Sequence, residues 1–311
     1  MADFDRPALV QFAQDSISRG SKSFRFASRL FDRTTRERVW LLYAWCRKCD
    51  DMADGQDHGG AMAAVTDPQE SLAAIRTLTA KALAGIPTGE PAFDCLGVVA
   101  RECGITARMA EDVIEGFALD AADWHPRRES DLYQYCYHVA GAVGVMMAVV
   151  MGVPADDDAT LDRACDLGLA FQLANIARDI AEDDAAGRCY LPDDWLATLD
   201  IGPGEHMKPH NRKKLALMGR WLADEAEQYE ASARVGAAHL PLRARWAVLS
   251  AAGIYGEIAR KVRAADSHAW DQRIFTSRPE KFRWVRKAFV DAVANNPRAM
   301  DRDAFWTRTR V

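Results

Sequence analysis

The chain has 311 residues, of which 49% are hydrophobic and 27% charged, the balance of a globular protein large enough to bury a sizeable core. Its formal net charge of −5 gives no reason to expect nucleic acid as a partner. The seven cysteines show neither disulfide-framework nor zinc spacing, which favours a reducing, cytoplasmic setting. The longest apolar run, residues 139–153, is shorter than the ~20 residues that span a bilayer and predicts a buried helix.

Apolar residues recur with the period of an α-helix through nearly the whole chain. The expected helices cover residues 8–19, 35–54, 69–84, 91–103, 106–119, 130–152, 158–183, 211–238, 242–270 and 279–293. Short Gly and Pro breakers separate them, and no persuasive strand pair or hairpin signal is found. The pattern predicts a single all-α domain over residues 1–311, with residues 1–14 and 295–311 at its periphery.

The first polar motif is Ser21-Lys22-Ser23-Phe24, which follows Gly20. Two hydroxyls and an ammonium group near a helix start can donate hydrogen bonds to a phosphate. The motif is weak evidence by itself, because a serine that caps the helix is the more common role.

The helix expected over residues 35–54 ends in an acidic stretch that contains Asp50 and Asp54. These carboxylates lie four residues apart and therefore share a helix face. A solvated acidic face is the alternative, but the apolar run over residues 39–45 predicts a central helix. Arg47 lies on the same face, where its guanidinium can grip an anionic ligand with two hydrogen bonds. The loop that follows, residues 55–68, is a candidate lid.

Small residues mark the stretch from Tyr135 to Gly144, with Ala140 and Gly141 inside it. They allow another helix, or a bulky apolar ligand, to approach the backbone closely. Tight helix packing is the simpler explanation, and both can hold at once. His138 and the other histidines show no zinc spacing and receive no ligand role.

The second acidic stretch is the more specific signal. Gln172, Asn175, Asp179 and Asp183 follow one another at spacings of three, four and four residues in an otherwise apolar helix. A polar network between buried helices is the alternative. Arg178 lies on a neighbouring face, where a pair with Glu182 would explain it equally well. The loop over residues 184–194 is a second candidate lid.

Together, the two carboxylate faces predict divalent metal ions, because hard oxygen ligands favour Mg²⁺ or Mn²⁺. The ligand that needs such ions in apolar surroundings is a diphosphate on a long hydrocarbon. Its leaving group must be neutralised, and the carbocation that remains must be shielded from water.

These motifs resemble those of the squalene/phytoene synthase family. The matching pieces are Ser21 to Phe24, Tyr43 to Asp54, Tyr135 to Gly144, Gln172 to Asp183, Arg188 to Pro192, and Tyr255. The resemblance extends from about residue 15 to residue 290. It implies the all-α isoprenoid synthase fold, a helical bundle around a central apolar cavity.

The resemblance also implies a reaction, in which two geranylgeranyl diphosphates condense head to head, through a cyclopropylcarbinyl diphosphate, to phytoene in carotenoid biosynthesis. It implies as metal ligands Asp50, Asp54, Asn175, Asp179 and Asp183. It implies a catalytic set of Asp50, Asp54, Asp179, Asp183, Tyr135 and Arg47. It implies as substrate-binding residues Ser21, Lys22, Ser23, Phe24, Tyr43, Gln172, Asn175, Arg178 and Tyr255.

Two other functions remain open at this point. The first is a synthase that joins two farnesyl diphosphates to squalene or dehydrosqualene; the second is a helical assembly factor of the same fold without activity. The expected cofactor is Mg²⁺ or Mn²⁺, without NADPH. The expected partners are two prenyl diphosphates, together with peripheral contact to a membrane and to other carotenoid-pathway enzymes.

Overall fold

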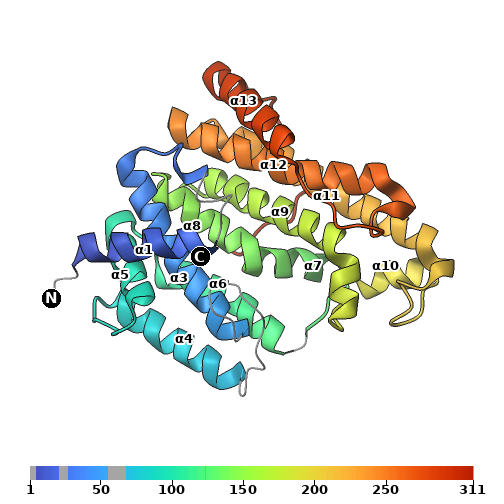
Figure 1. Cartoon of the computed structure of the whole chain (residues 1–311), viewed down its shortest axis with the longest axis horizontal. Helices are drawn as coiled ribbons and strands as arrows, with labels where there is room; N and C mark the ends of the chain where they lie inside the picture. Colours follow the sequence, from blue (N-terminus) through green and yellow to red (C-terminus); the bar gives the residue numbers. More distant parts are fainter. Residues whose placement is uncertain (1–4, 21–26, 55–67, 123, 311) are drawn as a thin grey trace. The chain divides into compact units, whose positions relative to one another are not determined.

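The computed structural model describes residues 5–20, 27–54, 68–122 and 124–310. Within these ranges every regular element is a helix, which confirms the predicted all-α class (Figure 1). None of the described helices is both long and apolar enough to cross a membrane. The chain divides into two compact units, residues 1–123 with 145–157 and residues 124–144 with 158–311. One domain over the whole chain therefore stays a prediction.

The first unit is built around helix α3. Its described helices are α1 (Arg6–Gly20), α3 (Arg33–Asp54), α4 (Pro68–Leu83), α5 (Pro91–Cys103), α6 (Ala107–Ala121) and the greater part of α8 (Ala142–Val150). Helix α3 packs against α1, α4 and α5, and it buries Leu41, Leu42 and Trp45 completely. The indole Nε1 of Trp45 donates to Thr79 Oγ1 of α4 at 3.2 Å. A helix held on several sides therefore carries the first acidic stretch.

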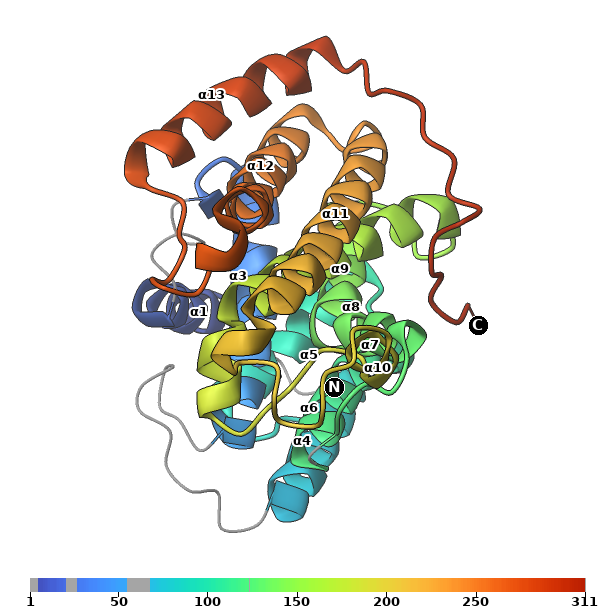
Figure 2. The same ribbon diagram turned by 90° about the vertical axis from the view of Figure 1, so that its right-hand side faces the viewer.

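The second unit is built around helix α9. Its helices are α7 (Glu129–Cys136), the π-helical turn η1 (Tyr137–Gly141), α9 (Asp158–Ala185), α10 (Asp193–Thr198), the 3₁₀ turn η2 (Pro209–Asn211), α11 (Arg212–Ala237), α12 (Leu242–Ala265), the 3₁₀ turn η3 (Asp266–His268) and α13 (Arg278–Ala294). Helix α9 packs against α7, η1, α11 and α12 (Figure 2). Leu169, Leu173 and Ile176 of this helix are buried. Its half-buried polar residues form what we call the polar stripe of α9: Gln172, Asn175, Asp179 and Asp183.

Three local features differ from the sequence-based expectation. The helix expected over residues 130–152 is interrupted by the π-helical turn, and the short helix α10 was not expected. The helix expected over residues 242–270 ends as an α-helix at Ala265, because Asp266 adopts a positive φ of 51°.

At the π-helical turn and the residues after it, the backbone approaches that of α9 closely. A Cβ at Gly144 would lie 2.6 Å from the carbonyl oxygen of Ala164, and one at Gly168 would overlap Ala140. The small residues of this stretch therefore serve tight helix packing.

Residues 300–310, called the C-terminal segment below, are fixed to the start of α9. Arg302 donates to Asp166 Oδ2 and Oδ1 at 2.7 and 2.6 Å, and Asp166 has no exposed surface. Arg308 lies 2.9 Å from Asp162, which also pairs with Arg310. The contacts of this segment add buried charge pairs to the helix that carries the second acidic stretch.

Candidate functional site

On α3, Arg47 draws the neighbouring carboxylates toward itself. Its Nε and Nη2 donate to Asp51 Oδ1 at 3.0 and 2.6 Å, and its Nη1 lies 3.8 Å from Asp50 Oδ2. The side chain of Asp51 is 11% exposed and that of Asp50 is 42% exposed. Asp50 is therefore the more accessible carboxylate. Asp54 is the last residue of α3, and its side chain lies outside the described part of the structure.

Tyr43 lies one helical turn before Arg47. Burial raises the pKa of its phenol, and the positive charge of Arg47 opposes that shift. The end of α1 reaches the same place, because a Cβ at Gly20 would overlap the Tyr43 hydroxyl and lie 3.4 Å from Arg47 Cδ. Gly20 therefore brings the chain to Tyr43 and Arg47 directly before the Ser21–Phe24 motif. The four residues of that motif, Ser21, Lys22, Ser23 and Phe24, lie outside the described residues.

On α9, two guanidinium groups meet the carboxylate of Asp179. Arg178 Nε donates to Asp179 Oδ1 at 2.7 Å, and its Nη2 donates to the other carboxylate oxygen. Arg273, from the segment after α12, lies 3.0 Å from Asp179 Oδ1. The side chains of Arg178 and Asp179 are 15% and 18% exposed. The pairing of Arg178 with Asp179 provides a cation at a place where an anionic ligand can share it.

Asp183 carries negative charge that its surroundings do not fully compensate. The pKa of this carboxyl is raised to about 6, first by burial and second by the negative charge of Asp179, against the opposing charge of Arg188. A cation at this point would favour the ionised carboxylate. About two and three turns earlier on α9, Asn175 and Gln172 add half-buried amide groups.

A divalent ion fits this set, because its donors are oxygen atoms and because Asp183 lacks compensation. Among the described residues no three His, Cys, Asp or Glu side chains lie close enough to form a metal centre. The amide of Asn175 would be a further oxygen donor, and the side chain of Asp54 lies outside the described residues.

The chain after α9 is docked through aromatic rings. Gly187, at a φ of 75°, turns the chain, and Arg188 N donates to the carbonyl oxygen of Asp183 at 2.8 Å. Tyr190 then stacks on Tyr135 with ring centres 4.9 Å apart, and Tyr135 also stacks with Trp124 at 5.2 Å. Tyr135 is almost fully buried as a result. These contacts hold part of the candidate lid over residues 184–194 in place.

Helix α12 brings Tyr255 to the same region of α9. Its ring stacks on Phe171 with centres 4.3 Å apart, and its phenol interacts electrostatically with Arg178. The indole Nε1 of Trp270 donates to the carbonyl oxygen of Ala177 at 2.9 Å, which ties the end of this region to α9. The stacked rings of Phe171 and Tyr255 and the guanidinium of Arg178 therefore lie beside the polar stripe.

The second unit thus joins Arg178, Asp179, Asp183 and Tyr255 by direct contact or by charge. Sequence reasoning missed two residues of this unit, Arg273 and Trp124. No sequence motif marks either residue, because each is far from its partner, or outside its helix, along the chain and meets it only in the folded protein. The predicted residues Tyr43, Arg47 and Asp50 share one face of α3 in the first unit.

Comparisons with known proteins place the chain among one group of enzymes. The family described as squalene/phytoene synthase matches residues 17–280. A phytoene synthase of Pseudescherichia vulneris is 46% identical over 97% of this chain and 99% of its own length. A 15-cis-phytoene synthase of Pantoea ananas is also 46% identical, over 95% of this chain and 96% of its own. The crystal structure of a dehydrosqualene synthase matches with a TM-score of 0.81 at 26% identity, covering 93% of this chain and 98% of that one.

Proposed function

Because the chain belongs to the squalene/phytoene synthase family, we propose that it condenses two geranylgeranyl diphosphates to phytoene and two diphosphates. The observation that carries this proposal is the polar stripe of α9. The carboxyl of Asp183 has a raised pKa there, and the guanidinium of Arg178 and the ring of Tyr255 lie along the same helix. The 46% identity to two phytoene synthases over nearly their full length supports the choice of substrate.

In this proposal the residues of α3 and α9 hold the diphosphate groups. Arg47 and Arg178 donate to diphosphate oxygens, because a planar guanidinium can offer two parallel hydrogen bonds. Ser21, Lys22, Ser23 and Tyr255 add further donors, while Gln172 and Asn175 orient the diphosphates through their amides. The first carbon–oxygen bond breaks as one diphosphate leaves, the second substrate's double bond attacks the allylic cation, and loss of a first proton closes the cyclopropane ring. The resulting cyclopropylcarbinyl diphosphate releases the second diphosphate, and the cation that remains rearranges and loses a second proton.

The expected cofactor is Mg²⁺, with Mn²⁺ as a substitute. Its ligands would be Asp50, Asp54, Asn175, Asp179 and Asp183, all oxygen donors. When bound, such an ion neutralises the diphosphate and makes it a better leaving group. Asp183 is suited to this role because burial and Asp179 disfavour its ionised form in the absence of a cation.

Aromatic residues protect the cationic intermediates from water in this proposal. Tyr135 is almost fully buried and stacks with Trp124 and Tyr190, and this cluster of three rings would help to exclude water. Tyr43 and Phe24 would line the apolar part of the site. An aromatic ring face can stabilise a nearby cation by about 0.5–2 kcal/mol. No NADPH is required for a product that is not reduced.

A second candidate is a synthase that uses two farnesyl diphosphates. The observation that favours it is the likeness to a dehydrosqualene synthase structure, with a TM-score of 0.81. Both reactions need the same diphosphate and metal chemistry, so the choice depends on the length of the hydrocarbon that the protein accepts.

The test is to incubate the purified protein and Mg²⁺ with each diphosphate separately and to identify the product by mass spectrometry. We expect a C40 hydrocarbon from geranylgeranyl diphosphate, with or without NADPH. Turnover of farnesyl diphosphate alone would replace the proposed substrate. Turnover of neither would favour the assembly-factor function.

A further inference from the structure

Helix α13 exposes apolar side chains along one face. Four of the eight large hydrophobic side chains that are exposed in the described part of the chain lie on this helix: Phe282, Phe289, Val290 and Val293. Their exposed fractions are 66%, 46%, 65% and 58%. Spacings of seven, one and three residues place them on one face of an α-helix. We call these four residues and Arg286 the outer face of α13. A contiguous apolar face of this kind is typical of an interaction surface.

The same helix is basic although the whole chain is acidic. It carries Arg278, Lys281, Arg283, Arg286 and Lys287 against Glu280 and Asp291, an excess of three positive charges. The formal net charge of the full chain is −5. Arg286 lies among the apolar residues of the outer face, where its long side chain can extend to a polar boundary while its methylene groups stay on apolar surface. The charge of α13 therefore complements an anionic partner.

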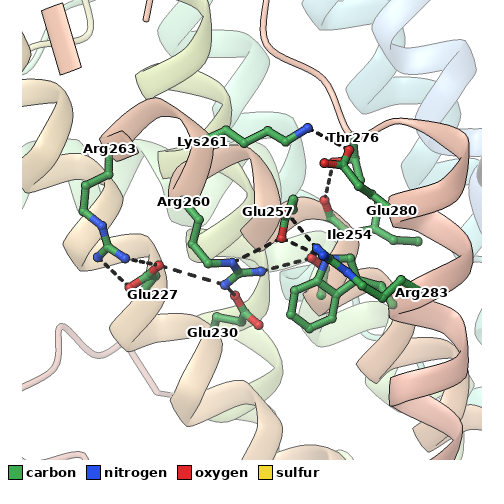
Figure 3. A network of polar contacts seen from close by, with 12 residues as sticks. Glu227, Glu230, Ile254, Glu257, Arg260, Lys261, Arg263, Thr276, Glu280 and Arg283 are labelled. Atoms are coloured by element: carbon green, nitrogen blue, oxygen red, sulfur yellow. Dashed lines mark hydrogen bonds and ion pairs between the residues drawn. The ribbon is translucent and has the colours of Figure 1, made fainter. Parts of the chain in front are cut away.

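Contacts on the opposite side hold α13 firmly on α12. Lys261 Nζ lies 2.7 Å from Glu280 Oε2, and Arg283 lies 3.1 Å from Glu257 Oε1 (Figure 3). Trp284 Nε1 donates to Glu257 Oε2 at 3.0 Å, and Ala288 and Ala292 are buried beneath the helix. The outer face is consequently the solvent side of a packed helix, although the ring of Phe289 at its edge also contacts Trp246 of α12, with ring centres 5.1 Å apart.

A second copy of this chain and a lipid bilayer could both cover the outer face, and the positive charge of α13 distinguishes between them. A second copy in a twofold dimer would bring the same basic helix against itself, which like-charge repulsion disfavours. A bilayer with anionic headgroups attracts the basic residues and accepts Phe and Val side chains at the boundary of its hydrocarbon. The combination of apolar and basic residues favours the bilayer.

We propose that α13 docks the protein on the surface of an anionic lipid bilayer, with the outer face inserted at the level of the headgroups. The proposal goes beyond the condensation reaction and does not depend on it. Basic residues are attracted to an anionic surface, and the apolar side chains add affinity in proportion to the area that they bury.

The test is sedimentation of the full chain with vesicles of phosphatidylcholine alone and of phosphatidylcholine mixed with phosphatidylglycerol. We expect the wild-type protein to bind the mixed vesicles more tightly and to lose most of this binding at about 1 M NaCl, where the Debye length is about 3 Å. The double variant Phe282→Ser/Val290→Ser should bind at least about tenfold more weakly. Arg286→Glu should bind at least about fivefold more weakly.

Two matched controls are available on exposed positions outside α13. Ile86→Ser removes an exposed apolar side chain from the first unit, and Lys213→Glu reverses an exposed charge on α11. Both should bind as the wild type does. Equal binding by the double variant and the wild type, or no binding of the wild type to mixed vesicles, would overturn the proposal. So would an oligomer in solution that the α13 variants dissociate while the vesicles stay unbound. Product formation in detergent, measured on the same variants, tests the condensation separately.

Discussion

At the scale of single residues, the carboxylates of α9 differ in their surroundings. Asp179 is paired with Arg178 and Arg273, whereas Asp183 has an elevated pKa and lies next to the charge of Asp179. Because burial and the charge of Asp179 disfavour the ionised form of Asp183, an added cation would favour that form. Substitutions of Asp179 and Asp183, one turn apart on the same helix, are therefore expected to have different effects.

Replacing Asp179 by Asn should lower turnover by orders of magnitude while the fold is retained. The substitution keeps the shape of the side chain and removes the charge proposed to bind metal and diphosphate. Steady-state kinetics with Mg²⁺ and a thermal unfolding curve measure the two effects. Asp50→Asn should behave alike. Asp156→Asn, an exposed position, is the control and should leave turnover unchanged. Near-normal activity of Asp179→Asn would remove the metal-binding assignment.

Asp183 should make the metal-free protein less stable as the pH rises. An unfolded aspartate ionises near pH 4, whereas the folded protein holds this proton up to about pH 6. Between these values the folded state binds more protons than the unfolded state, so stability falls with rising pH. The stability that Asp183→Asn gains relative to the wild type should therefore be larger at pH 7 than at pH 4. Melting temperatures in EDTA test this, and a pH-independent difference would contradict it.

At the scale of elements, the C-terminal segment and α9 form one packed structure. Tyr137 of the π-helical turn contacts Trp306, with ring centres 5.5 Å apart, and Phe305 contacts Tyr229 of α11 at 5.1 Å. Arg302 supplies the charge that the fully buried carboxylate of Asp166 needs. A buried carboxylate without its partner is costly, because its charge has lost water without gaining compensation.

Arg302→Met should consequently lower the free energy of unfolding by about 3–5 kcal/mol. The matched control is Arg310→Met, which removes an arginine of the same segment whose side chain is 53% exposed. That change should leave the free energy of unfolding nearly unchanged, because the pair is exposed on the Arg310 side and Arg308 still pairs with Asp162. Urea unfolding monitored by circular dichroism measures both. Equal, small losses for the two variants would show that the segment contributes little to the stability of α9.

At the scale of the whole molecule, the proposed reaction requires divalent ions. Removal of divalent ions by EDTA should abolish product formation, and excess Mg²⁺ should restore it. The reason is that two departing diphosphates carry charge that the arginines alone do not neutralise. The measurement is product yield before chelation, after chelation and after Mg²⁺ is added back. Unchanged yield in EDTA would exclude the metal-dependent mechanism.

The sequence by itself determined the helical class and nearly all helix boundaries, since local periodicity and Gly or Pro breakers act over a few residues. It also determined the motifs, because residues three or four apart on a helix share a face whatever the tertiary fold. The family follows from these motifs, and the match over residues 17–280 confirms it. The predicted roles of the individual site residues stay predictions.

Only the tertiary structure decided which partners these residues have. Arg47 turns to Asp51, Asp179 gains Arg273 from a distant segment, and Trp124 and Tyr190 stack on Tyr135. It also decided that the apolar residues of α13 point to solvent, because the sequence of a helix does not show which of its faces other elements cover. The physical reason is that burial and pairing depend on elements far apart along the chain, whose approach no local pattern records.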